Sequence, residues 1–217
     1  MHRARRVAIT VALLSWAGFG MVLYQVIAHG PLTAIDPPAI AWAASHRNGA
    51  WTAAAEWISR TGGPSMTSVY AGIFMLVALA RRRFATATAV ALVIYGGIVL
   101  NVIVKNSVQR GRPIMEDPLV HLITYSFPSG HAAASTVFGG FLIALVATRC
   151  ANARTRVLAI ALIASWIAAV CAGRVYLGAH YPTDVAGGLL EGTGWLLLCG
   201  FVAQRYGLLR ADRLRAR

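Results

Sequence analysis

The sequence predicts an all-α fold, a six-transmembrane-helix bundle that forms one integral-membrane domain over residues 1–217. Of these 217 residues, 58% are hydrophobic and only 12% are charged, whereas soluble domains contain about 25% charged residues. The charged residues lie in short clusters between long apolar runs, not along the polar face that a nucleic-acid-binding protein would present. We therefore attribute the net charge of +13 to membrane topology or an anionic substrate, and we expect no nucleic-acid partner.

Six runs approach the length of about 20 apolar residues that crosses a hydrocarbon core of roughly 30 Å. They cover residues 7–28, 64–80, 84–104, 131–147, 157–177 and 182–203. The first run follows three arginines and resembles a signal peptide in that respect. It is longer than the roughly 7 to 15 apolar residues of a cleaved signal, so we expect an anchor helix. The second run is among the shortest of the six.

The basic residues predict the orientation, because cytoplasmic loops of membrane proteins are enriched in Lys and Arg. With the N-terminus in the cytoplasm, 14 of the 20 basic residues fall on the cytoplasmic side. Both termini are then cytoplasmic, and the connections 29–63 and 105–130 face the exterior. In the first of these connections, Trp42, Trp51 and Trp57 predict a helix that lies at the lipid interface, where Trp is enriched.

The third span ends in a polar motif, Lys105-Asn-Ser-Val-Gln-Arg-Gly-Arg112-Pro113. Positions seven apart on a helix lie about 20° from alignment, so Lys105 and Arg112 share a face if the helix continues to Pro113. These two cations could bind an anion. They could equally be interfacial anchors whose side chains extend to the lipid headgroups.

The fourth span begins after Phe127-Pro128-Ser129-Gly130-His131. Ser129 is a favourable N-cap, and Gly130 permits close approach of the backbone to a ligand. The unpaired N–H groups of a first helical turn can bind an anion, and His131 would face it. An ordinary helix cap is the alternative.

The fifth and sixth spans are joined by Gly173-Arg174-Val-Tyr-Leu-Gly-Ala-His180-Tyr-Pro182-Thr-Asp184, in which Pro182 suits the first turn of the sixth span. Asp184 can accept a hydrogen bond from one imidazole nitrogen of His180. The other nitrogen is then free to act as a base or nucleophile. A structural His–Asp pair is the alternative.

Together, the motifs place three cations, two histidines, a carboxylate and a helix N-terminus at one membrane face, where charged groups are costly and usually functional. A dianionic phosphate needs several cationic and N–H donors, and two histidines can supply a nucleophile and a proton donor. The cations would repel a divalent ion, so we expect no metal and no other cofactor. Glu191 alone lies deep in an apolar run, and we expect it to point into the bundle.

The chain resembles the membrane-bound type-2 phosphatidic acid phosphatase superfamily in three ordered motifs: Lys-x6-Arg-Pro, Pro-Ser-Gly-His and Ser-Arg-x5-His-x3-Asp. One position departs from the pattern, because Gly173 stands where the third motif begins with Ser. The resemblance implies that His180 is a nucleophile that forms a phosphohistidine, oriented by Asp184, and that His131 protonates the leaving oxygen. It also implies that the phosphoryl group is bound by Lys105, Arg112, Ser129, Gly130 and Arg174.

The function implied by this resemblance is metal-independent hydrolysis of a terminal phosphoryl group from a membrane lipid. Candidate substrates are phosphatidic acid, phosphatidylglycerol phosphate and undecaprenyl diphosphate. The same site could serve a lipid A phosphatase or a phosphotransferase; from other classes, a transporter or an inactive membrane scaffold stays open. The expected partners are the bilayer and a phospholipid or polyprenyl phosphate, with no obligatory protein partner. Short loops favour a bacterial cytoplasmic membrane, with the site facing the periplasm.

Overall fold

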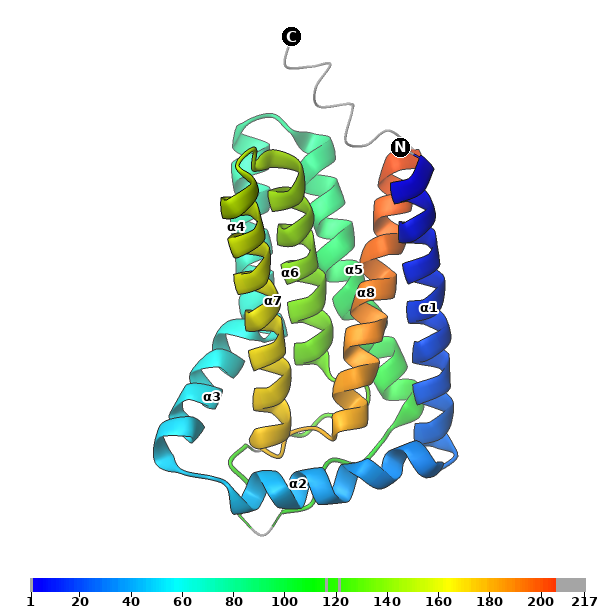
Figure 1. Cartoon of the computed structure of the whole chain (residues 1–217), viewed down its shortest axis with the longest axis vertical. Coiled ribbons are helices and arrows are strands. Elements are labelled where there is room, and N and C mark those ends of the chain that lie inside the picture. The colour runs from blue at the N-terminus through cyan, green and yellow to red at the C-terminus, as the bar shows by residue number, and fades with distance from the viewer. Residues whose placement is uncertain (1, 116, 121, 206–217) are drawn as a thin grey trace.

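The computed structural model describes residues 2–115, 117–120 and 122–205, and within those ranges it contains no β-strand. Its helices are α1 (His2–Ile27), the 3₁₀-helix η1 (Pro31–Ile35), α2 (Asp36–Ser45), α3 (Gly49–Gly62), α4 (Pro64–Ala80), α5 (Phe84–Val108), α6 (Gly130–Arg149), α7 (Ala153–Tyr176) and α8 (Pro182–Arg205). The long helices form an upright bundle, and α2 lies across one end of it (Figure 1). The all-α prediction is confirmed.

Five helices of the described chain are long and apolar enough to cross a membrane: α1 from Arg5, α5, α6, α7 and α8. Helix α4 has the predicted bounds, but its 17 residues are short for a span. It joins α3 at a bend of 43°, and the two together would make a sixth span. Gly63, which is extended, ends α3, and Pro64 begins α4, since proline lacks the N–H that a continuous helix requires.

Glycines bring α8 close to the first turns of α6. A Cβ atom on Gly188 would lie 2.5 Å from the Ser129 carbonyl oxygen, and one on Gly192 would lie 2.9 Å from the Ala133 carbonyl oxygen. Small residues allow such close backbone contact between helices in membranes. The N-terminal ends of α6 and α8, which carry the second and third motifs, therefore lie together.

The first long connection contains η1, α2 and α3 instead of one interfacial helix. The Asn48 side chain accepts a hydrogen bond from the Trp51 backbone N–H (3.0 Å) and so begins a new helix, α3. Trp42 on α2 and Trp51 and Trp57 on α3 are all exposed, as expected for side chains at a lipid interface.

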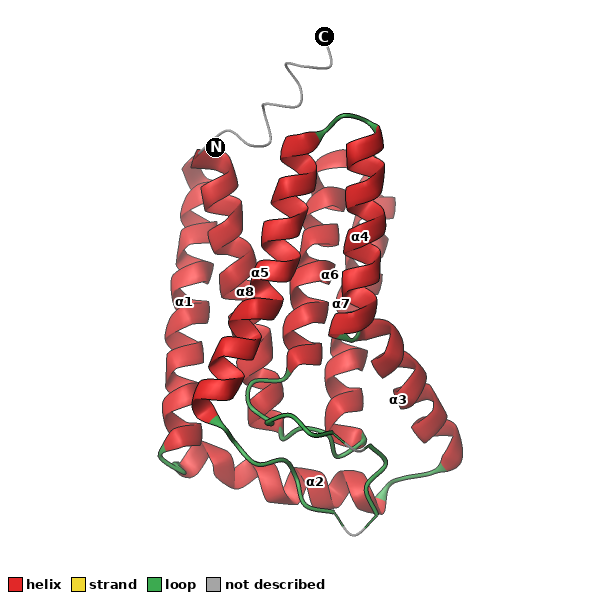
Figure 2. Ribbon diagram, turned by 180° about the vertical axis from the view of Figure 1, so that it is seen from behind, coloured by secondary structure: helices red, strands yellow, loops and turns green. Residues whose placement is uncertain are grey.

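The second long connection crosses the same end of the bundle as α2 (Figure 2). Helix α5 ends at Val108, because Gln109 adopts the left-handed conformation (φ 54°) and turns the chain away. The helix does not continue to Pro113, so the condition under which Lys105 and Arg112 would share a helical face is not met, and Arg112 reaches the bundle from a loop. Farther along this connection, the buried Phe127 ring stacks on Phe19 of α1 at 6.0 Å.

Candidate active site

A cavity of about 210 Å³ lies where α5, α6 and α7 meet the second connection. Six of the eight predicted site residues line it: Lys105, Arg112, Gly130, His131, Arg174 and His180. The other two, Ser129 and Asp184, are fully buried and are not among the lining residues. Apolar side chains, among them Ile94, Ile98 and Val137, form the part of the wall that extends along the helices.

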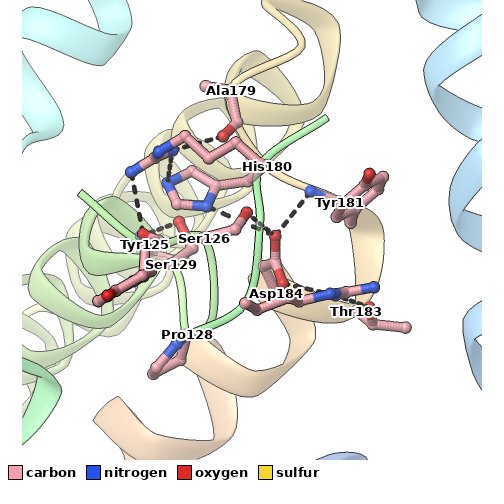
Figure 3. Close-up of polar contacts among 12 residues, drawn as sticks. Tyr125, Ser126, Pro128, Ser129, Ala179, His180, Tyr181, Thr183 and Asp184 are labelled. Carbon is pink, nitrogen blue, oxygen red and sulfur yellow. Dashed lines mark hydrogen bonds and ion pairs between the residues drawn. The ribbon is translucent and has the colours of Figure 1, made fainter. Parts of the chain in front are cut away.

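His180 is buried and lies between an arginine and a carboxylate (Figure 3). Its Nε2 atom lies 3.4 Å from Arg112 Nη1, and its Nδ1 atom lies 3.6 Å from Asp184 Oδ2, longer than a hydrogen bond. An arginine can only donate, so this contact assigns the proton to Nδ1 and a lone pair to Nε2. Burial lowers the pKa of His180 to about 4, although Asp184 raises it, and the ring is neutral at pH 7.

Three hydrogen bonds hold the Asp184 carboxylate. It accepts hydrogen bonds from the Ser126 hydroxyl, from the Tyr181 backbone N–H (2.9 Å) and from Arg110 Nη1 (2.6 Å), and it faces His180 (Figure 3). The bond from Arg110 is charge-assisted and is therefore among the stronger hydrogen bonds in proteins. The orientation of this carboxylate is thus set by residues of two different connections.

Arg110 also binds a second carboxylate, that of Asp36 at the start of α2. The Arg110 Nη2 and Asp36 Oδ2 atoms lie 2.7 Å apart, and Asp36 accepts a further hydrogen bond from the Thr183 backbone N–H (3.1 Å). Burial by itself lowers the pKa of Arg110, but Asp184 and Asp36 raise it overall. Neither Arg110 nor Asp36 was predicted as a site residue. Two signals were available in the sequence. Arg110 lies two positions before Arg112, and Asp36 is one of the few carboxylates outside the predicted spans.

Among the described cations that line the cavity, Arg174 has buried donors without a hydrogen-bond partner. It is 3% exposed, and its Nη1 atom donates to the Ser59 hydroxyl on α3 (2.5 Å). Its Nε and Nη2 atoms are buried without a hydrogen-bond partner among the described residues. Leaving buried charged donors unpaired is costly, so this side of the guanidinium suits an anion in the cavity.

Lys105 and Arg112 are held in place by backbone carbonyls. Lys105 Nζ donates to the carbonyls of Tyr125 and Pro128, both at 2.8 Å. Arg112 donates through Nε to the Thr124 carbonyl and through Nη1 to the Ala179 carbonyl, both at 2.6 Å. The loop that precedes α6 and the connection between α7 and α8 therefore hold two cations of the cavity in place.

The first turn of α6 borders the cavity with Gly130 and His131. The Ser129 hydroxyl accepts from the Ala132 backbone N–H (3.4 Å), which makes Ser129 the N-cap. His131 packs against the α3–α4 junction, where a Cβ atom on Gly63 would lie 2.8 Å from His131 Nε2. A Cβ atom on Gly173 would lie 3.6 Å from the Ala55 carbonyl of α3, so the departure from the third motif is at a helix contact outside the cavity lining.

Glu191 does not line the cavity, but it contacts a residue that does. It is 2% exposed, and its Oε2 atom accepts a hydrogen bond from Asn101 Nδ2 (2.6 Å) on α5. Asn101 itself lines the cavity. The prediction that Glu191 points into the bundle is confirmed.

Residues 86–206 match the family model of the PAP2 superfamily. The chain is 36% identical over 126 residues to lipid A 1-phosphatase from Rhizobium etli, an alignment that covers 54% of this chain and 50% of the relative. It is 36% identical over 99 residues to phosphatidylglycerophosphatase B from Bacillus subtilis, covering 43% of this chain and 46% of the relative. The matched regions thus span about half the length of these relatives.

Two solved structures share the fold. The PAP2-type phosphatidylglycerolphosphate phosphatase of Bacillus subtilis superposes with a TM-score of 0.76 at 24% identity, over 89% of this chain and 96% of that chain. LpxE of Aquifex aeolicus superposes with a TM-score of 0.58 at 19% identity, over 79% of this chain and 95% of that chain. The similarity to these two structures therefore covers the arrangement of the helices as well as the motifs.

Proposed function

Because the chain belongs to the PAP2 superfamily, we propose that it is a single-domain membrane phosphatase that hydrolyses a terminal phosphoryl group from a lipid. The observation that carries this proposal is Arg174, which lines the cavity with two further cations and two histidines and has two buried nitrogens without a partner among the described residues. A phosphate dianion matches these donors in charge and in hydrogen-bonding capacity. Its negative charge is balanced by side chains, so the proposed reaction uses no metal ion.

In the proposed reaction, His180 Nε2 attacks phosphorus while the bond from phosphorus to the lipid oxygen breaks. Protonated His131 transfers its proton to that leaving oxygen, and Asp184 stabilises the positive charge on the phosphorylated His180 ring. His131 then takes a proton from water as the water oxygen attacks phosphorus and the bond from phosphorus to His180 Nε2 breaks, which releases phosphate and restores neutral His180. The phosphoryl oxygens are held by Lys105, Arg112, Arg174 and the backbone N–H of Gly130, with Ser129 fixing that helix turn.

The proposed substrates are lipids that carry a terminal phosphate or diphosphate. The apolar wall of the cavity, which includes Ile94 and Ile98, suits the lipid portion next to the phosphate. The names of the relatives favour lipid A 1-phosphate and phosphatidylglycerol phosphate, and phosphatidic acid and undecaprenyl diphosphate share the same reactive group. A phosphotransferase would use the same residues with an acceptor other than water.

The experiment is phosphate release from these four lipids by purified protein in detergent, with EDTA present. His180→Ala should lower turnover by about a thousandfold or more, because it removes the attacking atom. The matched control is His46→Ala, since His46 is exposed and stacks on Trp42 away from the cavity. Release of phosphate from none of the lipids would overturn the proposal, and retention of about a tenth of the activity in His180→Ala would exclude His180 as nucleophile.

A further inference from the structure

A second, larger cleft lies at the end of the bundle opposite the candidate active site. Its volume is about 1110 Å³, and its walls come from α4, α5, α6 and α8 with one contact from α1. Helix α5 runs obliquely across the bundle (Figure 2). Trp195 Nε1 of α8 donates to the Val93 carbonyl of α5 (2.8 Å), and the cleft extends from this contact to the helix ends.

The lining of the cleft changes from polar to apolar with depth. Its polar side chains lie in the last or first turns of the helices or in the turn between α4 and α5, and they include Arg81, Arg83, Arg149 and Gln204. Its deep wall is apolar and includes Phe74, Val93, Phe141 and Leu196. No Asp, Glu or His occurs among the described lining residues. The mouth is therefore cationic and the interior is hydrophobic.

The depth of the cleft matches one leaflet of a bilayer. Arg83, the residue that caps the start of α5, and Val93 within α5 both line the cleft, and ten positions along a helix rise by about 15 Å. This is about half of a hydrocarbon core of roughly 30 Å. A molecule with its charged group beside the arginines would place its apolar part within the same leaflet.

We propose that this cleft binds an anionic glycerophospholipid from the leaflet at the N-terminal end of the bundle. Arginine recognises phosphate through paired hydrogen bonds, and basic sites between transmembrane helices attract anionic lipids. The acyl chains would pack against Phe74, Phe141 and Leu196. The described lining contains none of the residues assigned to the proposed phosphatase reaction, so this binding site is independent of that activity.

The test titrates delipidated protein in detergent with phosphatidylglycerol or phosphatidylcholine, and it records the unfolding temperature and the lipid retained in native mass spectrometry. Phosphatidylglycerol should raise the unfolding temperature saturably and should be retained in native mass spectrometry. Phosphatidylcholine should need about tenfold higher concentration or more to produce the same two effects. Equal effects of the two lipids on wild-type protein would overturn the proposal.

Two matched pairs of variants locate the site. The triple variant Arg81→Gln, Arg83→Gln and Arg149→Gln should lose most of the preference for phosphatidylglycerol. Arg154→Gln with Arg156→Gln, in α7 and outside the cleft lining, should keep it. Ala89→Phe narrows the cleft and should reduce retention, whereas Leu92→Phe, on an exposed part of α5, should not. The proposal would be contradicted if both arginine variants lost the preference for phosphatidylglycerol equally, or if Ala89→Phe retained as much lipid as wild-type protein. Either result would mean that the lipid is attracted to the charged surface and does not bind in the cleft.

Discussion

At the residue scale, the environment of Asp184 distinguishes this site from a simple His–Asp pair. The carboxylate faces His180 at 3.6 Å, but its shortest ionic contact is with Arg110 at 2.6 Å. Arg110 in turn binds Asp36 at 2.7 Å. The orientation of the carboxylate that faces the proposed nucleophile therefore depends on a residue of α2, which lies across the end of the bundle.

The variant Asp36→Asn tests this dependence. It leaves the cavity lining intact but removes the charge that holds Arg110, so kcat should fall by about 10- to 100-fold with little change in KM. The matched control is Asp117→Asn, since Asp117 is exposed. The measurement is steady-state phosphate release, with the unfolding temperature recorded for each variant. An unchanged kcat for Asp36→Asn would show that Asp184 keeps its position without this contact.

The pKa of His180 predicts how stability depends on pH. Burial lowers this pKa to about 4, from an ordinary value near 6.5. Between these two values the unfolded chain binds a proton that the folded protein does not, so the free energy of unfolding decreases as the pH falls from about 6.5 to about 4. The decrease should reach about 3 kcal/mol at most.

His180→Gln isolates that contribution, because glutamine does not titrate. Denaturant-induced unfolding in detergent at pH values from 7 to 4 should give a steeper loss of stability for wild-type protein than for the variant. Parallel curves would mean that His180 is not kept neutral by the fold.

At the element scale, the close contact between α6 and α8 assembles the site. The N-terminal turn of α6 carries His131, and the first turn of α8 carries Asp184. Gly188 lies next to the Ser129 carbonyl, and the Ser129 backbone N–H donates to the Asp184 carbonyl (2.9 Å). A wider spacing between the two helices would therefore separate the second motif from the third.

Gly188→Val is expected to force these helices apart, because the atom that meets the new Cβ is a backbone carbonyl and cannot rotate away. Overpacking of this kind costs about 1 to 3 kcal/mol or more, and we expect a lower unfolding temperature together with lost activity. Gly200→Val on the same helix is the control, since a Cβ atom there meets nothing within 4 Å. Equal thermal unfolding of the two variants would contradict the role of Gly188.

At the scale of the whole molecule, the candidate active site and the cleft for an anionic lipid lie at opposite ends of the bundle. The sequence predicts that the end with the active site faces the exterior. Ile123 in the second connection is exposed, so a cysteine at this position can test the orientation. Ser126 in the same connection is fully buried, so a cysteine there would not report accessibility to a reagent in the solvent.

Single cysteines at positions 123 and 82, in a background without Cys150, Cys171 and Cys199, should differ in labelling by a membrane-impermeant thiol reagent in intact cells. Ile123→Cys should label and Arg82→Cys should not, because positively charged turns are retained in the cytoplasm. Labelling of position 82 alone would place the active site on the cytoplasmic side. Lysed cells, in which both positions are accessible, provide the control.

Much of the fold was predictable because its signals are local. The bounds of α4 agree with the prediction, and the ends of the other spans differ from it by a few residues. The end of α5 was not predicted, since Gln109 adopts a left-handed conformation that its residue type does not require. The connection before α3 was expected to contain one interfacial helix, but the Asn48 cap divides it.

Local sequence patterns were enough to predict the all-α membrane fold, the long apolar segments and six of the residues that line the cavity. These follow from hydrophobic runs and from motifs whose members lie within a few residues of a helix end. The packing of the helices and loops was needed to see that Arg110 links Asp184 to Asp36, and that two donors of Arg174 have no partner in the described part of the chain. Such contacts join residues far apart in the chain, and which partners meet depends on how closely α6, α7 and α8 pack, which no local pattern encodes.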